Sequence, residues 1–167
     1  MRRIHQLIGI LTILFLTIQN PLFAATDPYE SLPPGKATGR IKVNAQGFLI
    51  KYAYARKSIA EKEDKDKADY IILLTNRTFP EDFSKIDRFE ISRYAARYDL
   101  QGLLIGVNKD RQLVFADILR LRSITGSVEF KPSSNEDDLI EGRLYTNGQQ
   151  QYLHLKYEID ITFSTKP

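Results

Sequence analysis

The chain has 167 residues, contains no cysteine and carries a formal net charge of +3. Without cysteine it can form no disulfide, no thiol nucleophile and no cysteine-based metal site. Arg2 and Arg3 supply part of the charge. Beyond residue 24 the chain has 22 basic side chains, two fewer than the 24 of the whole, against 21 acidic ones. A surface so close to neutrality gives no electrostatic reason to expect binding to nucleic acid or to an anionic membrane.

Residues 1–24 predict a signal peptide. Arg2 and Arg3 form a basic start, residues 7–18 are apolar, and Pro21 precedes a cleavage site that ends in the small residue Ala24. The apolar stretch of about 12 residues is short for a bilayer span, which requires about 20. We therefore expect a bacterial protein that is exported, periplasmic or secreted, with no stable membrane span after cleavage. An uncleaved N-terminal anchor is the alternative.

The chain beyond the signal predicts a tether followed by a single domain. Residues 25–36 are rich in proline, glycine and serine and predict the tether. Residues 37–167 predict one β-rich domain, which is long enough to build its own hydrophobic core.

The domain begins with a predicted β-hairpin. Residues 40–44 and 48–55 alternate apolar and polar side chains, and residues 45–47 supply the turn. The charged run at residues 61–67 interleaves lysines with acids and has no glycine. It therefore predicts a solvated loop or the end of a short helix, rather than a calcium-binding loop.

The middle of the domain predicts a buried strand and then a helix. Residues 69–76 are apolar on both faces, as in a central strand, and Pro80 ends this strand. Residues 80–100 follow with an imperfect helical stripe of large side chains. The stripe consists of Phe89, Tyr94, Ala95 and Tyr98.

The second half predicts further strands joined by turns. Asn147 and Gly148 form the strongest turn signal, typical of a tight hairpin that leads into the last strand. The pattern as a whole predicts a mostly β fold, an antiparallel β-sandwich or partly open barrel of about seven or eight strands with one short helix. The strands expected before this turn are residues 101–108, 111–118, 125–131 and 139–146.

Residues 152–163, YLHLKYEIDITF, predict one long strand with one buried and one solvated face. Apolar and polar residues alternate along it, the pattern of a half-buried strand. The buried face is formed by Leu153, Leu155, Tyr157, Ile159, Ile161 and Phe163. The solvated face gives a candidate interaction surface, formed by Tyr152, His154, Lys156, Glu158 and Asp160.

His154 is the single histidine that remains once His5 is removed with the signal. A catalytic histidine would need an orienting carboxylate within about 2.6–3.2 Å. The nearest neighbour of His154 on its face is Lys156, roughly 6.6–6.8 Å along the strand. We therefore interpret His154 as an exposed structural residue.

No other motif in the sequence nominates a catalytic centre. The chain has no Gly-x-Ser-x-Gly elbow, no phosphate loop and no dinucleotide fingerprint. One histidine is too few for an ordinary zinc site. Two carboxylates alone can hydrolyse a glycoside, but no pair among the 21 acids stands out. We predict no catalytic residue, no metal ligand and no cofactor.

Four short motifs are spread over nearly the whole predicted domain. They read KYAYA, LLTNRTFP, IEGRLYT and YEIDITF in chain order. Together they resemble the KxAYA, VLLTxxP, VxGRLYT and YxYDxTF strand motifs of a group of functionally uncharacterised exported bacterial β-domains. Ile159 stands where that group often has an aromatic residue. The resemblance implies one exported domain, and it implies no activity.

These observations favour an exported, non-catalytic binding or interaction module, with a protein or another envelope component as its partner. Eight tyrosines in the predicted domain could supply contacts, although tyrosine also fills sheets and cores. A carboxylate-dependent hydrolase of carbohydrate or peptide, and a carrier of a small apolar ligand, are the alternatives. A pocket with two carboxylates would favour the hydrolase, and a large apolar cavity would favour the carrier.

Overall fold

The computed structural model describes residues 31–58, 68–121, 123–134 and 136–167, and for Phe89 it describes the backbone alone. The predicted signal peptide at residues 1–24, the first half of the tether and the charged run at residues 61–67 lie outside the described residues. The first strand begins at Lys36, the last residue of the predicted tether.

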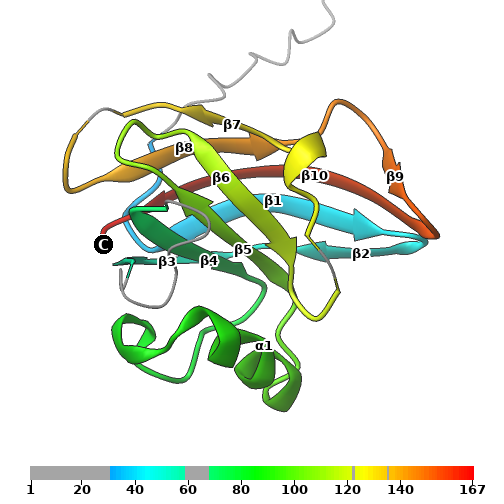
Figure 1. The fold of residues 1–167 in the computed structure, drawn as a ribbon, viewed down its shortest axis with the longest axis horizontal. Coiled ribbons are helices and arrows are strands. Elements are labelled where there is room, and N and C mark those ends of the chain that lie inside the picture. Colours follow the sequence, from blue (N-terminus) through cyan, green and yellow to red (C-terminus); the bar gives the residue numbers. More distant parts are fainter. Residues whose placement is uncertain (1–30, 59–67, 122, 135) are drawn as a thin grey trace, which may run out of the picture. The chain divides into compact units, whose positions relative to one another are not determined.

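Ten strands, one α-helix and two short 3-10 helices make up the described part of the chain (Figure 1). The helices are α1 (Arg88–Arg97), η1 (Phe83–Lys85) and η2 (Thr125–Ser127). The strands are β1 (Lys36–Val43), β2 (Gln46–Leu49), β3 (Tyr52–Lys57), β4 (Tyr70–Thr75), β5 (Gly102–Val107), β6 (Leu113–Ile118), β7 (Glu129–Pro132), β8 (Ile140–Tyr145), β9 (Gln150–Tyr152) and β10 (Leu155–Thr165).

All ten strands belong to one antiparallel sheet. Eight of them lie in the order β6-β5-β4-β3-β1-β10-β8-β7, while β2 pairs with β1 and β9 pairs with β10. The sheet curls around a core, and among the described residues its two edge strands, β6 and β7, do not pair with each other (Figure 1). The domain is therefore a partly open barrel, which confirms the predicted mostly β, antiparallel class with one short helix.

The barrel interior is filled by the alternating side chains of its strands. Along β10 the buried positions are Leu155, Tyr157, Ile159, Ile161 and Phe163, as the sequence predicts. The ring of Phe163 stacks on that of Phe130 from β7, with 5.6 Å between the ring centroids. This stacking joins the last strand to the edge of the sheet and makes β10 a central wall of the core.

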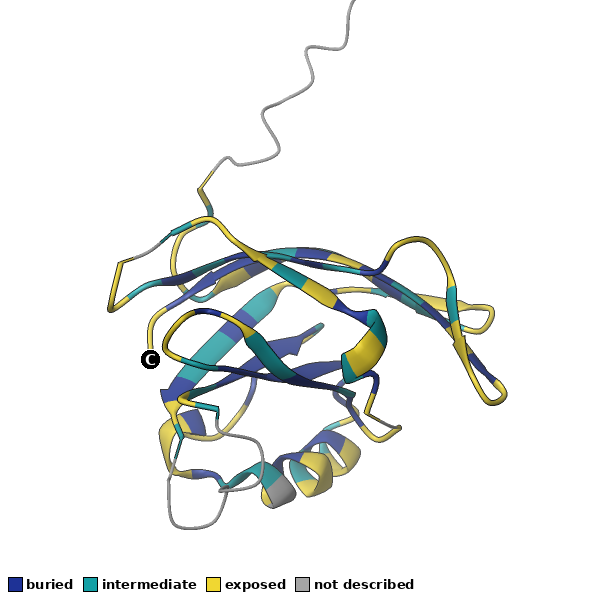
Figure 2. Cartoon of the chain, turned by 45° about the horizontal axis from the view of Figure 1, so that its top comes forward, coloured by how far each residue is buried: buried dark blue, intermediate teal, exposed yellow. Residues whose placement is uncertain are grey.

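A second core lies between the sheet and α1, so β4 is buried on both faces (Figure 2). Ile72 and Leu74 point into the barrel, whereas Ile71 and Leu73 pack toward the helix. This confirms the prediction of a central strand. On the helix, Ala95 of the predicted stripe is buried, but the fully buried Ile91 was not part of that stripe.

Aspartates determine where the helical segments begin. The side chain of Asp87 accepts a hydrogen bond from the backbone N–H of Glu90 at 2.9 Å, and α1 starts at the next residue after Asp87. Asp82 caps η1 in the same way, through the N–H of Ser84. These caps make α1 shorter than the predicted span of residues 80–100. No helix in the described part of the chain is both long and apolar enough to cross a bilayer.

The hairpin predicted at Asn147 and Gly148 is wrong. The strands on either side of this turn, β8 and β9, both pair with β10 and not with each other. Tyr145 lies opposite Asp160, and Gln150 lies opposite Tyr157. The chain therefore advances five residues between β8 and β9 while the facing strand β10 advances three. Gly148, with φ of 69°, forms part of a bulge in one interrupted strand beside β10.

The tight turn lies instead within the stretch predicted as one strand. Leu153 has a φ of 55° and joins β9 to β10, and its side chain is 61% exposed rather than buried. The prediction of a strand over residues 152–163 is therefore wrong at its start, and β10 runs from Leu155 to Thr165. Alternation alone could not show the turn, because a leucine is rarely found at positive φ.

One end of the barrel is closed by Arg111, which lies in the turn between β5 and β6 and is only 7% exposed. Its Nη2 group donates to the backbone carbonyls of Glu136, Asp137 and Leu139 at 2.7, 3.3 and 3.2 Å. The guanidinium also lies 5.1 Å from the centroid of the Tyr70 ring. Arg111 therefore holds the β5–β6 turn against the loop between β7 and β8.

Candidate functional site

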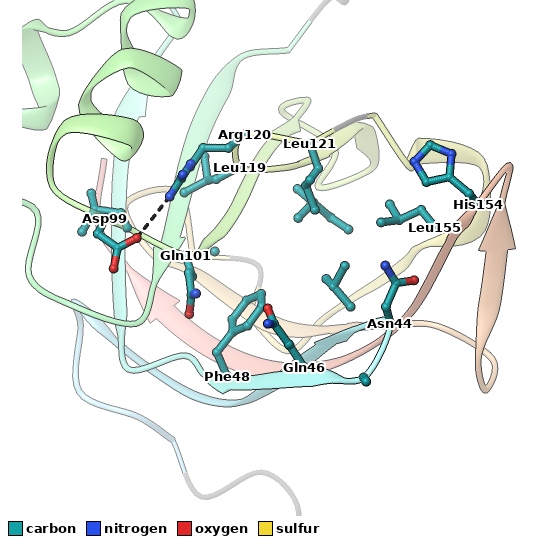
Figure 3. Close-up of a pocket in the computed structure, with 15 residues that line it drawn as sticks. Asn44, Gln46, Phe48, Asp99, Gln101, Leu119, Arg120, Leu121, His154 and Leu155 are labelled. Carbon is teal, nitrogen blue, oxygen red and sulfur yellow. Dashed lines mark hydrogen bonds and ion pairs between the residues drawn. The ribbon is translucent and has the colours of Figure 1, made fainter.

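A pocket of about 750 Å³ lies at the opposite end of the barrel, where β5 begins and β6 ends (Figure 3). Four chain segments meet there: the β1–β2 turn, the segment between α1 and β5, the end of β6, and the start of β10. The lining residues are Val43, Asn44, Ala45, Gln46, Phe48, Asp99, Leu100, Gln101, Gly102, Ile118, Leu119, Arg120, Leu121, His154 and Leu155.

Apolar side chains form one part of the pocket wall. Phe48 rises from β2, Leu155 lies at the start of β10, and Leu121 follows β6 (Figure 3). Leu121 is 50% exposed although it is a large apolar residue. An apolar surface of this kind gains free energy when a ligand covers it.

Polar groups surround this apolar wall. Gln46 and Gln101 bring amide side chains, which both donate and accept hydrogen bonds, and His154 brings an imidazole (Figure 3). Arg120 donates to the carboxylate of Asp99 at 3.2 Å, so the two charges at the pocket compensate each other. The arrangement suits a ligand without net charge.

The β1–β2 turn is fastened to β10 by Asn44. Its N–H donates to the carbonyl of Lys156 at 2.7 Å, and its Oδ1 accepts from the N–H of Lys156 at 3.0 Å. Asn44 has a φ of 54°, which its side chain tolerates better than most. This double contact fixes the wall of the pocket that carries Gln46 and Phe48.

Backbone strain gathers around the pocket. Asn44, Asp99 and Arg120 line it with φ values of 54°, 50° and 66°, and Leu153 lies beside the lining residue His154. Among the described residues a fifth non-glycine with positive φ, Arg111, lies at the other end of the barrel. Strained backbone of this kind tends to cluster at functional sites.

The pocket offers binding groups rather than a catalytic pair. Of the described residues that line it, Asp99 alone has a carboxylate, and that carboxylate is ion-paired with Arg120. His154 is exposed at the rim. Among the described residues there is also no group of three or more histidine, aspartate or glutamate side chains that could hold a metal ion.

The five residues of the predicted interaction surface lie in three different places. His154 is at the pocket rim. Lys156, Glu158 and Asp160 lie on the outer face of β10, away from the core. Tyr152 is on β9 opposite the buried Leu155, and partners that lie directly opposite share a face. The prediction that these residues share one face fails at Tyr152, because the turn at Leu153 reverses the chain.

The acids on the outer face of β10 are compensated within the sheet. Glu158 lies 3.3 Å from the amine of Lys42 on β1. Asp160 accepts two hydrogen bonds from the guanidinium of Arg143 on β8, at 2.7 and 2.9 Å. These cross-strand pairs account for Glu158 and Asp160 as sheet contacts. The residues that sequence reasoning missed are the pocket residues far apart in the chain, above all Phe48, Gln101 and Leu121.

Comparison with known proteins found no matching family model, no matching curated protein and no matching solved structure.

Proposed function

We propose that this chain is an exported, non-catalytic binding module that takes its ligand into the pocket at the open end of the barrel. The observation that carries the proposal is the lining of that pocket. An apolar wall that includes the half-exposed Leu121 stands beside the amides of Gln46 and Gln101. Sites for small ligands combine apolar surface with a few polar groups that fix orientation, and the mouths of β-barrels are frequent places for them.

The lining also indicates the chemistry of the ligand. The charges of Asp99 and Arg120 compensate each other, and the other polar side chains of the pocket include neutral amides. A ligand with an apolar part and neutral hydrogen-bonding groups fits this lining better than a purely apolar one. The pocket thus favours the binding module over the apolar carrier, and its single paired carboxylate gives no support to a hydrolase with two carboxylates.

Export and the likeness to exported bacterial β-domains belong to the same proposal. They rest on the basic and apolar pattern of residues 1–24 and on the strand motifs from KYAYA to YEIDITF. In this reading the binding site operates in the periplasm or outside the cell.

The proposal predicts that ligands bind at this pocket and that a bulky charge placed there blocks them. Neutral amphipathic fragments would be screened against the ¹⁵N-labelled protein by NMR. We expect hits to shift the amide signals of Asn44, Gln101 and His154. Leu121→Arg should weaken these hits by about tenfold or more, since it places a long charged side chain against the apolar wall.

Leu153→Arg is the matched control, because it makes the same substitution at another exposed leucine. Leu153 is 61% exposed, as Leu121 is 50% exposed, but it does not line the pocket. Binding should be unchanged in this variant. Hits that leave the three amide signals in place, or that bind Leu121→Arg as well as the wild type, would exclude the pocket as the binding site.

A further inference from the structure

One wall of the pocket is a strand edge without a partner. β2 pairs with β1 along one side, and no other strand of the described residues pairs with its other side. The N–H of Ile50 donates to the carbonyl of Gly39 on β1 at 3.0 Å. Because successive residues of a strand point their backbone groups to opposite sides, Gly47 and Leu49 direct N–H and C=O groups away from β1.

The fold shows where a partner strand would lie. The N–H of Lys51 points to the same side as those of Gly47 and Leu49, and it donates to the carbonyl of Thr75 at the end of β4 at 2.9 Å. β4 ends at Thr75, which lies opposite Tyr52 of β3. No residue of β4 therefore lies opposite β2, which extends beyond the end of β4.

The pocket occupies this place. Gln46 and Phe48 of β2 line it on one side, and Gln101 and Gly102 at the start of β5 line it as well (Figure 3). β4 separates β3 from β5 in the sheet order. The space beside β2 is thus the continuation of the position that β4 fills farther along the barrel.

β7, an edge strand of the main sheet, is protected in a way that β2 is not. β7 carries Glu129, Lys131 and Pro132. The N–H of Ser133 donates to the carbonyl of Glu141 on β8 at 2.9 Å, so the nitrogen of Pro132 faces outward, where it offers no donor to another strand. Charges and outward prolines are the usual means of blocking an edge.

β2 has none of these devices. Its sequence, QGFL, contains no charge and no proline. A Cβ atom added at Gly47 would meet only ordinary contacts, with Lys42 Cγ at 3.7 Å and the Ile41 carbonyl at 3.9 Å. Packing within the domain therefore does not require glycine there. Glycine inside a strand often marks a place where another backbone approaches.

We propose that the partner of this pocket is an extended, uncharged segment of polypeptide that pairs with the free edge of β2. Its backbone bonds to the N–H and C=O groups of Gly47 and Leu49, and an apolar side chain covers Phe48 and Leu121. The proposal rests on the pocket function above and names its ligand class. The donors and acceptors of the edge call for a peptide backbone, and the compensated pair of Asp99 and Arg120 calls for a partner without charge at this point.

The test uses a phage-displayed library of linear 12-residue peptides, selected on the whole protein and eluted by excess soluble protein. A selected peptide is then synthesised with one N-methyl group at each position in turn. We expect affinity losses of about tenfold or more at alternate positions, because an N-methyl group removes a backbone donor and every second donor of a paired strand faces its neighbour. This readout needs no protein variant, so it does not depend on the folding of any mutant.

Leu49→Pro supplies the protein side of the test, since it removes an outward donor and gives β2 the device that β7 already has at Pro132. It should weaken the peptide by about tenfold or more. Leu49→Ala keeps the N–H and should weaken peptide binding less than Leu49→Pro, which separates loss of the donor from loss of the side chain. Gln151→Pro is the matched control at another strand edge and should leave peptide binding unchanged. The backbone groups of Lys156 bond to Asn44, on the side away from β9, so the N–H of its β9 partner Gln151 points away from β10.

The remaining outcomes each decide one of the two proposals. If no peptide is selected, or if N-methylation lowers the affinity equally at every position, the edge pairing is overturned. If Leu121→Arg weakens a selected peptide but Leu49→Pro does not, the pocket function stands and the edge pairing falls. Self-association that Leu49→Pro abolishes, without peptide binding, would identify a second copy of the chain as the occupant and would also overturn the proposal.

Discussion

Each end of the barrel contains an arginine with a positive φ, and the two arginines have opposite effects. Arg111 lies just before β6 and Arg120 just after it, and their φ values are 61° and 66°. Arg111 is 7% exposed and donates to three backbone carbonyls of the β7–β8 loop. Arg120 is exposed and makes one ion pair with Asp99. The first end is closed, and the second is the pocket.

The difference shows that the burial and the hydrogen-bond partners of an arginine decide whether it stabilises the fold. The buried guanidinium of Arg111 needs hydrogen-bond acceptors, and three backbone carbonyls of the β7–β8 loop supply them. At the open end Arg120 is exposed, and its pair with Asp99 is screened by solvent. A turn with the same backbone strain therefore stabilises the fold at one end and leaves room for a ligand at the other.

The largest expected effect on stability concerns β10, the strand that runs from the pocket to the closed end. Ile161 lies in β10 with no exposed surface, between the pocket at Leu155 and the closed end at Thr165. Ile161→Ala should lower the free energy of unfolding by about 2–5 kcal/mol, out of a domain total of about 5–15. Chemical denaturation monitored by circular dichroism would measure the change.

Glu158→Gln is the control on the opposite face of the same strand. Its pair with Lys42 is partly exposed, so the loss should stay below about 1 kcal/mol. If Ile161→Ala left the free energy of unfolding unchanged while Glu158→Gln lowered it strongly, the assigned faces of β10 would be inverted.

The next effect tests the comparison of the two arginines directly. Arg111→Met keeps most of the side-chain volume but removes the donors of three carbonyls, so it should destabilise the protein by about 3 kcal/mol. Arg120→Met removes one exposed ion pair and should cost less than about 1 kcal/mol. If denaturation curves gave the same loss of unfolding free energy for Arg111→Met and Arg120→Met, the two ends would not differ as described.

The smallest effect is a dependence on pH at the closed end. A hydrogen bond from Lys166 lowers the pKa of Asp138 below its ordinary value of 3.8, and the same contact raises the pKa of Lys166 above 10.5. A carboxylate with a lowered pKa stabilises the fold fully above its unfolded value and loses this contribution as pH falls through the folded one. For Lys166 the contribution is lost at the alkaline end, as pH rises through its raised pKa.

Asp138→Asn should therefore flatten the fall of the thermal unfolding midpoint below about pH 4, where the wild type loses its contact with Lys166. The difference should be small, because both groups are exposed, and about 1 M salt should reduce it further through screening. Parallel curves for variant and wild type at low salt would exclude a role for this pair in acid stability.

The strands could be predicted from the sequence where their local pattern agreed with their environment. The apolar run of β4 and the alternation of β10 from Leu155 to Phe163 both reflect burial that is fixed along one segment. The turns could not be predicted as well. Asn147 and Gly148 have the best local hairpin signal, yet the chain reverses at Leu153, because pairing of both β8 and β9 with β10 outweighs the preference of a single dipeptide.

The sequence by itself determined which side chains of β10 from Leu155 to Phe163 enter the core, since alternation of apolar and polar residues is a property of neighbours in the chain. The tertiary structure alone decided the pocket. Phe48, Gln101, Leu121 and His154 meet there from segments that share no pattern. The free edge of β2 exists because β4 ends at Thr75, and the length of one strand cannot be read from the sequence of another.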